Sequence, residues 1–174
     1  MTTLIYFAYG SNMSTCRLRA RTPSARVVST ARLHQYSLVF HKESLDGSSK
    51  CHIEHTQNPD DIVHGVVYQL QLAEKPGLDK VEGLGKGYDE KQVSVIVPSG
   101  DEIIACTYYA THINRSLKPY HWYKEHVLRG AREHGLPDSY IENIESVISV
   151  ADPDQDNQLK ELSIYSGSIE KTSF

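Results

Sequence analysis

Two short segments of this 174-residue chain carry residue types suited to catalysis, and the first is the turn Tyr9-Gly10-Ser11-Asn12. A glycine followed by small polar residues at the start of a helix leaves backbone N–H groups free to bind an anion or an oxyanion. An ordinary tight turn, in which Ser11 and Asn12 bond their own backbone, is the structural alternative. On the pattern alone, the ordinary tight turn is favoured.

The second segment contains Glu82, which lies between the apolar Val81 and a glycine-rich loop at residues 83–87. A carboxylate beside flexible backbone and facing an apolar pocket can serve as a general acid or base. A solvated glutamate at the end of a helix is the simpler interpretation, and without further information it is favoured.

The elements that must position these two segments follow from the hydrophobic patterns. Residues 4–9 predict a buried strand that enters a turn at residues 10–12, where positive φ is expected. Ser14 is expected to cap a helix over residues 15–21, which Pro23 stops. Further strands are predicted at residues 26–30, 35–40, 51–55 and 62–70.

The second half of the chain begins with a short predicted helix over residues 76–83, where a glycine provides the stop. Residues 92–97 and 102–111 alternate apolar and polar side chains and predict a hairpin. Beyond Pro119 the spacing becomes helical and predicts two helices. We therefore expect one domain over residues 1–151 and a polar C-terminal tail, residues 152–174, that is loosely packed or mobile.

Composition indicates a soluble globular protein, because 39% of the residues are apolar and 23% are charged. A formal net charge of −4 gives no broad basic surface for nucleic acid or an anionic membrane, so small-molecule partners are expected. No signal peptide pattern or membrane-length apolar run is found, and the cytoplasm is the expected compartment. Three widely spaced cysteines, Cys16, Cys51 and Cys106, fit reduced thiols.

Three segments in a fixed order resemble the γ-glutamylcyclotransferase family. They are Tyr6-Phe7-Ala8-Tyr9-Gly10-Ser11-Asn12, Leu78-Asp79-Lys80-Val81-Glu82-Gly83, and Tyr123-Lys124 with Gly130-Ala131-Arg132-Glu133-His134-Gly135-Leu136-Pro137. The resemblance covers residues 4–150. It implies an α+β fold with a mixed β-barrel-like sheet and surrounding helices. The implied reaction releases an amino acid from a γ-glutamyl dipeptide as 5-oxoproline forms.

By the same resemblance, Glu82 is the catalytic carboxylate and the segment from Tyr6 to Asn12 binds the substrate. Tyr88 and Tyr123 resemble pocket tyrosines, although the loop before Tyr88 is one residue shorter than in vertebrate members, which loosens that match. The substrate's own amine attacks its γ-carbonyl, so the reaction requires no metal or organic cofactor. The resemblance also allows a homodimer.

The same residues allow four other interpretations. Ser11 as the nucleophile of a hydrolase lacks the G-x-S-x-G pattern and an assignable histidine. Zinc at Cys51, His52, Glu54 and His55 conflicts with strand geometry, in which neighbouring side chains point to opposite faces. The remaining alternatives are a non-catalytic γ-glutamyl-binding module and a cyclotransferase for a γ-glutamylamine, glutathione or a γ-glutamyl-capped metabolite.

Three later histidines are expected to be surface or partly packed residues: His121, His126 and His134.

Overall fold

The computed structural model describes residues 2–166 and consists of seven strands and five α-helices in that range. The strands are β1 Thr3–Ala8, β2 Arg26–His34, β3 Tyr36–Glu43, β4 Ser49–His55, β5 Ile62–Gln71, β6 Tyr88–Ile96 and β7 Glu102–Ala110. The helices are α1 Thr15–Arg21, α2 Lys75–Glu82, α3 His121–Glu133, α4 Asp138–Ser146 and α5 Gln155–Leu162, with short 3₁₀ turns η1 Ser11–Met13 and η2 Leu72–Glu74.

Five of the strands close into a barrel in the order β1-β5-β2-β6-β7. Neighbouring strands pair antiparallel except where β7 meets β1, which are parallel at Tyr6 and Cys106. The remaining strands, β3 and β4, form a separate antiparallel pair. The predicted α+β fold with a barrel-like sheet is therefore confirmed.

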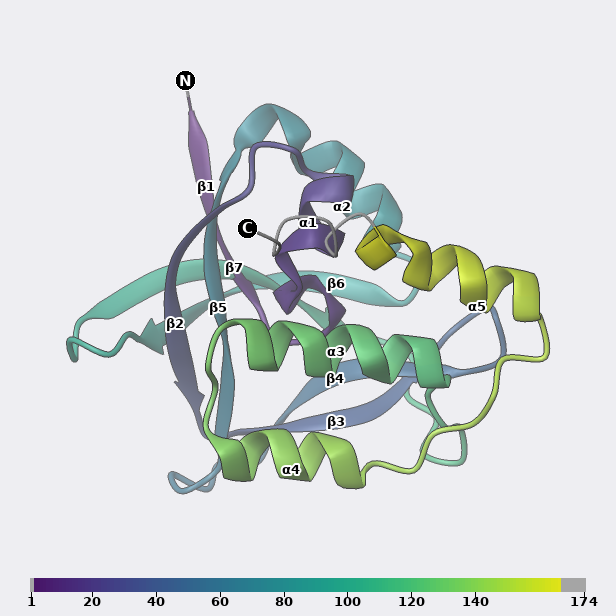
Figure 1. Ribbon diagram of the computed structural model, residues 1–174. Helices are drawn as coiled ribbons and strands as arrows, with labels where there is room; N and C mark the ends of the chain where they lie inside the picture. Colours follow the sequence, from purple (N-terminus) through teal and green to yellow (C-terminus); the bar gives the residue numbers. More distant parts are fainter. Residues whose placement is uncertain (1, 167–174) are drawn as a thin grey trace, which may run out of the picture.

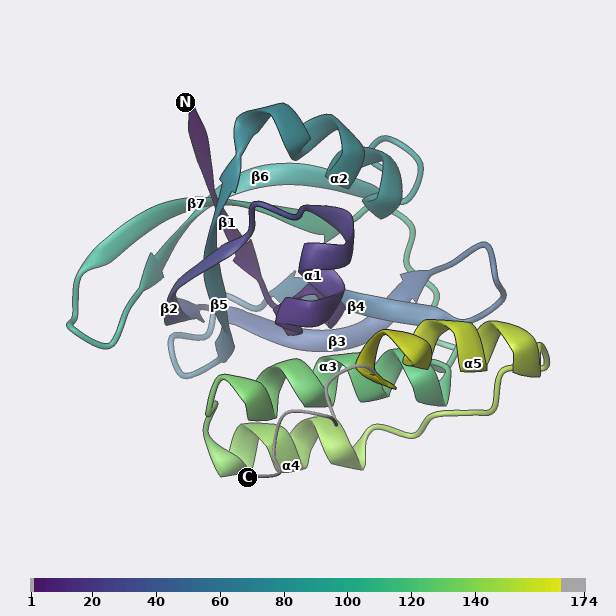
Figure 2. The ribbon, with the colours of Figure 1, turned by 45° about the horizontal axis from the view of Figure 1, so that its top comes forward.

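The helices lie around the barrel on different sides (Figures 1 and 2). In Figure 2, α3 and α4 run side by side below the β3–β4 pair, whereas α2 lies on the opposite side of the molecule near β6. Helix α5 lies beside α3. No helix in residues 2–166 combines the length and apolarity that a membrane span requires.

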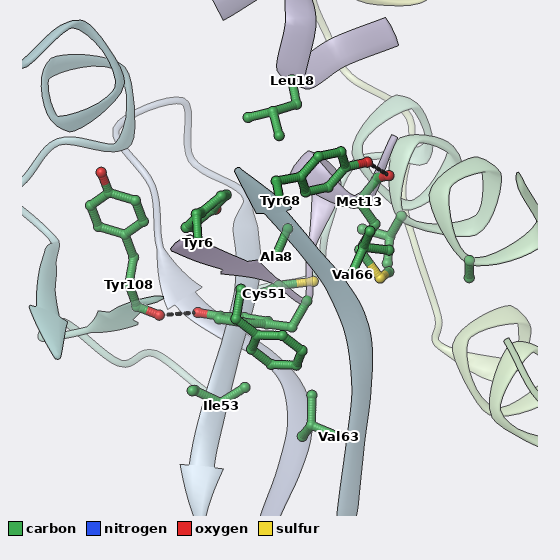
Figure 3. Packing of buried hydrophobic residues seen from close by; sticks show 14 of the residues in the cluster. Tyr6, Ala8, Met13, Leu18, Cys51, Ile53, Val63, Val66, Tyr68 and Tyr108 are labelled. Atoms are coloured by element: carbon green, nitrogen blue, oxygen red, sulfur yellow. Dashed lines mark hydrogen bonds between the residues drawn. The ribbon is translucent and has the colours of Figure 1, made fainter. Parts of the chain in front are cut away.

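The core centres on β1 and β5, which is why these two strands read as apolar runs in the sequence. Val63, Val66, Val67 and Tyr68 of β5 are completely buried. Figure 3 shows Tyr68 reaching across to Met13, where its hydroxyl donates a hydrogen bond of 2.8 Å to the backbone oxygen. The barrel wall thereby holds the turn that follows β1.

The turn itself differs from the expectation of positive φ. Gly10 has φ −114°, so the left-handed region does not explain this glycine. A Cβ at position 10 would lie 3.0 Å from Cβ of Cys51, which is tighter than ordinary van der Waals contact. The close passage of β4 therefore favours glycine at this position. Ser14 caps α1 as predicted and accepts a hydrogen bond from the N–H of Arg17.

Helix α2 ends as the sequence predicts. Gly83 follows Glu82 with φ 73° and ψ 44°, the left-handed conformation in which glycine stops a helix without strain. Its N–H bonds back to the carbonyls of the last turn, and the chain then loops into β6. Glu82 is therefore the last residue of a helix rather than part of a flexible loop.

The prediction of a loosely packed tail is wrong for residues 152–166. Asp152 is buried and accepts a hydrogen bond of 2.7 Å from the indole of Trp122. Helix α5 follows, and its Glu161 forms an ion pair with Arg17 at 2.6 Å. A polar segment can pack against the domain when its side chains find buried hydrogen-bonding or charged partners. The hydrophobic pattern of the sequence does not reveal such partners. The boundary at residue 151 stays a prediction, and residues 167–174 lie outside the described residues.

Candidate active site

A small cavity brings the two candidate segments together. Its volume is about 20 Å³, which leaves room for about one water molecule. Segments from β1, η1, α2, β4, β6, β7 and α3 meet here, although most of them are far apart in the sequence. The lining residues are Tyr6, Tyr9, Gly10, Ser11, Asn12, Cys51, Glu82, Tyr88, Tyr108 and Tyr123.

Glu82 contributes the carboxylate of this cavity, and its Oε1 is held from two sides. Arg21 at the end of α1 donates from Nη1 at 2.7 Å, and Asn12 donates from Nδ2 at 3.0 Å. Arg21 also donates to Oδ1 of Asn12 at 2.8 Å, which closes a three-residue network. The Arg21 and Glu82 side chains are only 19% and 15% exposed. A guanidinium and an amide therefore face the carboxylate, and Glu82 is not the solvated helix-end glutamate that its local sequence favours.

The η1 turn presents unused backbone donors beside this network. Among the described residues, no acceptor takes the N–H of Gly10, Ser11 or Asn12. Converging N–H groups of this kind bind anions or a developing oxyanion. Within the same range no histidine is hydrogen-bonded to Ser11, so the Ser-His arrangement of a hydrolase does not form.

The tyrosines of the cavity are fixed by hydrogen bonds. Tyr6 accepts from Asn12 at 3.0 Å, Tyr9 donates to the carbonyl of Tyr108 at 2.6 Å, and Tyr88 donates to the carbonyl of Cys51 at 2.6 Å. Burial raises the pKa of Tyr9, Tyr88 and Tyr123 well above the ordinary value. These phenols therefore stay protonated at neutral pH and act as rigid walls and hydrogen-bonding groups rather than as bases.

Cys51 lies in the cavity wall but is not a nucleophile in this state. Burial raises the pKa of its thiol to about 12, and only the thiolate is nucleophilic. Its backbone N–H donates to the hydroxyl of Tyr123 at 3.0 Å. Cys51 thus links β4 to α3 next to Gly10, and its role is packing. All three cysteines are free, as predicted.

Most of the predicted site residues meet at the cavity, but two do not. Phe7 and Ala8 are buried in the core and do not line it. Three residues that sequence analysis missed do contact the site: Arg21, Cys51 and Tyr108. The buried carboxylate needed a cationic partner, but nothing in the sequence distinguishes Arg21 from Arg17 and Arg19 on the same helix.

Larger hollows lie elsewhere on the molecule. One, of about 500 Å³, is an open groove between Arg19, Arg26 and Gln69, and another of about 420 Å³ lies between His64 and Tyr140. Neither hollow combines a fixed carboxylate with unused backbone donors, and a large volume without such groups does not indicate a catalytic site. The small cavity is therefore the candidate active site.

The later histidines differ from expectation at one position. His126 is completely buried in α3, where Nε2 lies 2.9 Å from Nη1 of Arg17 and Nδ1 lies 2.7 Å from the hydroxyl of Tyr165. The prediction of a surface or partly packed residue is wrong for His126. In residues 2–166, no three His, Cys, Asp or Glu side chains gather in a metal-binding arrangement.

Proteins of known sequence or structure are similar to this chain over most of its length. A family model described as AIG2-like matches residues 62–144. A γ-glutamylcyclotransferase of Bos taurus is 36% identical over 147 residues, which span 82% of this chain and 78% of that protein. The protein of the same name from Homo sapiens is 35% identical over equal shares.

A solved structure named γ-glutamyl cyclotransferase superimposes with a TM-score of 0.80 at 30% identity, covering 92% of this chain and 99% of that one. Sequence and fold therefore agree over nearly the full described range. On these similarities, the chain belongs to the γ-glutamylcyclotransferase family.

Proposed function

We propose that this enzyme is a γ-glutamylcyclotransferase that converts a γ-glutamyl amino acid into 5-oxoproline and the free amino acid, with Glu82 as the general base and acid. The observation that carries the proposal is the contact between Asn12 and Glu82 at 3.0 Å, which joins the η1 turn to the end of α2. Membership of the γ-glutamylcyclotransferase family supports the reaction.

The chemistry needs one proton-transfer group. The α-amine of the γ-glutamyl residue attacks its own γ-carbonyl carbon, a new C–N bond closes the five-membered lactam, and the original amide C–N bond breaks. The α-ammonium group loses two protons as the lactam N–H forms. Glu82 takes the first and returns it to the departing nitrogen, then takes the second from the ring nitrogen, which converts the released amine to its ammonium form. Atoms and charge balance without a co-substrate.

The turn and the carboxylate divide the work. The N–H groups of Gly10, Ser11 and Asn12 would hold the α-carboxylate or the oxyanion formed on the γ-carbonyl. Because the reaction is intramolecular, holding the chain folded supplies a large share of the acceleration, with effective molarities on the order of 10⁵ M or more. Buried tyrosines suit this restraint, since they shape a stiff cavity.

Substrate entry requires movement of the cavity wall. A space of about 20 Å³ does not hold a γ-glutamyl group. Arg21 and Glu82 are the partly exposed members of the network, so their ion pair is the expected entrance. The proposal also keeps the cytoplasm as the compartment, which suits three free cysteines, and a homodimer as the assembly.

The test combines product detection with one substitution. Purified protein is incubated with γ-glutamyl-alanine, and 5-oxoproline is quantified by chromatography. Glu82→Gln keeps the shape of the side chain but removes the base, so kcat should fall by about 10³-fold or more while substrate affinity changes little.

Glu142→Gln is the matched control, because Glu142 is an exposed glutamate of α4 and its loss should leave kcat unchanged. If Glu82→Gln turned over at the wild-type rate, Glu82 would be removed from the mechanism. Binding of γ-glutamyl-alanine by the wild type without any 5-oxoproline would instead indicate the non-catalytic module.

A further inference from the structure

A lysine beside the cavity has no role in the mechanism above. Lys42 lies near the end of β3, and its Nζ is 4.9 Å from the centre of the Tyr88 ring, which lines the cavity. The same ammonium packs on Gly87, where an added Cβ would lie 3.0 Å from Nζ. Gly87 precedes Tyr88 and ends the loop that begins after Glu82. The Tyr88 ring, which lines the cavity, is therefore in contact with the ammonium of Lys42.

This ammonium has no anionic partner. Among residues 2–166, Lys42 takes part in no ion pair, and its side chain makes no hydrogen bond. Its cross-strand neighbour Lys50 uses Asp46 at 2.7 Å. Two like charges therefore sit side by side on one strand pair, and only one of them is neutralised.

The electrostatic setting agrees with a missing counterion. Partial burial holds the pKa of Lys42 below its ordinary value, and the opposing influence of Glu82, Asp46 and Glu43 does not restore it. Contact with the Tyr88 ring offsets only part of the cost of burying a cation at such a site. An anionic ligand beside Tyr88 would relieve both the desolvation and the repulsion from Lys50.

We propose that Lys42 binds the α-carboxylate of the leaving amino acid and so selects γ-glutamyl amino acids over γ-glutamylamines. This inference rests on the proposed function. The amide nitrogen of the leaving residue must lie at Glu82 to receive its proton, and the α-carboxylate is only two bonds from that nitrogen. It therefore falls beside the loop at residues 83–87, where the ammonium of Lys42 lies.

The matched substrates are γ-glutamyl-alanine and γ-glutamyl-ethylamide, which differ only in the leaving-group carboxylate. The quantity to measure is the ratio of their kcat/KM values, from release of 5-oxoproline. Lys42→Met keeps the aliphatic stem and removes the charge, and Lys42→Gln repeats the test with a polar side chain. The control is Lys86→Met, which removes an exposed charge from the neighbouring loop.

We expect the ratio to fall by about 10- to 100-fold in both Lys42 variants, mainly through KM for the dipeptide, and to stay within about twofold in Lys86→Met. An unchanged ratio would overturn the inference. So would an equal loss on both substrates, which would assign Lys42 to the γ-glutamyl carboxylate. If the wild type released 5-oxoproline from neither substrate, the proposed function itself would fail, and this role would fail with it.

Discussion

At the scale of single residues, Arg21 is the group that orients the Glu82 carboxylate for proton transfer. It holds Oε1 together with Asn12, while Oε2 accepts no hydrogen bond from the described residues. One oxygen is thereby fixed, and the other is free for the ammonium of a substrate. A carboxylate held in one rotamer loses little orientation entropy during proton transfer.

Arg21→Met should therefore lower kcat by about 10-fold or more, because Glu82 loses its orientation, and should reduce the free energy of unfolding by about 3 kcal/mol, because a largely buried carboxylate loses its cation. Steady-state kinetics and urea unfolding measure the two effects. Arg132→Met is the control, since the Arg132–Glu145 pair is about half exposed and far less costly to remove. A wild-type kcat in Arg21→Met would show that Glu82 needs no such support.

At the scale of elements, the site depends on how closely α3 packs against the η1 turn. Gly130 of α3 faces this turn, and a Cβ there would lie 2.5 Å from both Cβ of Met13 and the backbone N of Ser14. Such distances cannot be met without moving one element. Glycine has a low helix propensity and so destabilises α3 slightly. Its missing side chain, however, lets the η1 turn pack against α3 and reach the cavity.

Gly130→Ala is expected to destabilise the protein by about 2 kcal/mol and to lower kcat/KM, since the turn must shift away from Glu82. The comparison is Gly77→Ala in α2, where no atom lies within 4 Å of the added Cβ. That substitution should be neutral or stabilise by up to about 1 kcal/mol through helix propensity. Equal unfolding free energies for the two variants would contradict this packing argument.

At the scale of the whole molecule, the C-terminal helix is bound to the site through a buried polar network. Arg17 of α1 pairs with Glu161 of α5 and donates to Nε2 of His126, which leaves Nδ1–H of the histidine to donate to Tyr165. Tyr165 in turn donates to Ser14, the cap of α1. The histidine is neutral in this network, because burial and the Arg17 guanidinium disfavour a second proton more strongly than Glu161, 3.4 Å from Nε2, favours it.

This preference for the neutral histidine predicts a pH dependence of stability. Burial lowers the pKa of His126 from its ordinary value of 6.5 to about 4. The unfolded chain therefore binds a proton that the folded chain does not, and stability falls as the pH drops from about 6.5 towards 4. Between pH 7 and 4.5, the wild type should lose about 2–3 kcal/mol more unfolding free energy than His126→Gln.

Urea unfolding at the two pH values measures this difference. His121→Gln serves as the reference, because His121 is exposed and its removal should leave the pH dependence of the wild type. Parallel losses in the wild type and His126→Gln would rule out His126 as the titrating group.

Much of the local structure followed from the sequence, because it depends on nearest neighbours along the chain. Apolar runs predicted β1 and β5, Ser14 predicted the N-terminal cap of α1, and Gly83 predicted the end of α2. The fold class and the pairing of the η1 turn with Glu82 came from motifs whose order resembles a family, not from either motif alone.

Only the tertiary structure decided which distant groups meet. Arg21 as the partner of Glu82, Cys51 against Gly10, and Lys42 beside Tyr88 join residues that no local pattern connects. The docking of α5 belongs here as well, since its polar side chains carry no apolar periodicity. Local pattern specifies helices, strands and turns, whereas the charge environment of a site depends on contacts that form only when the barrel closes.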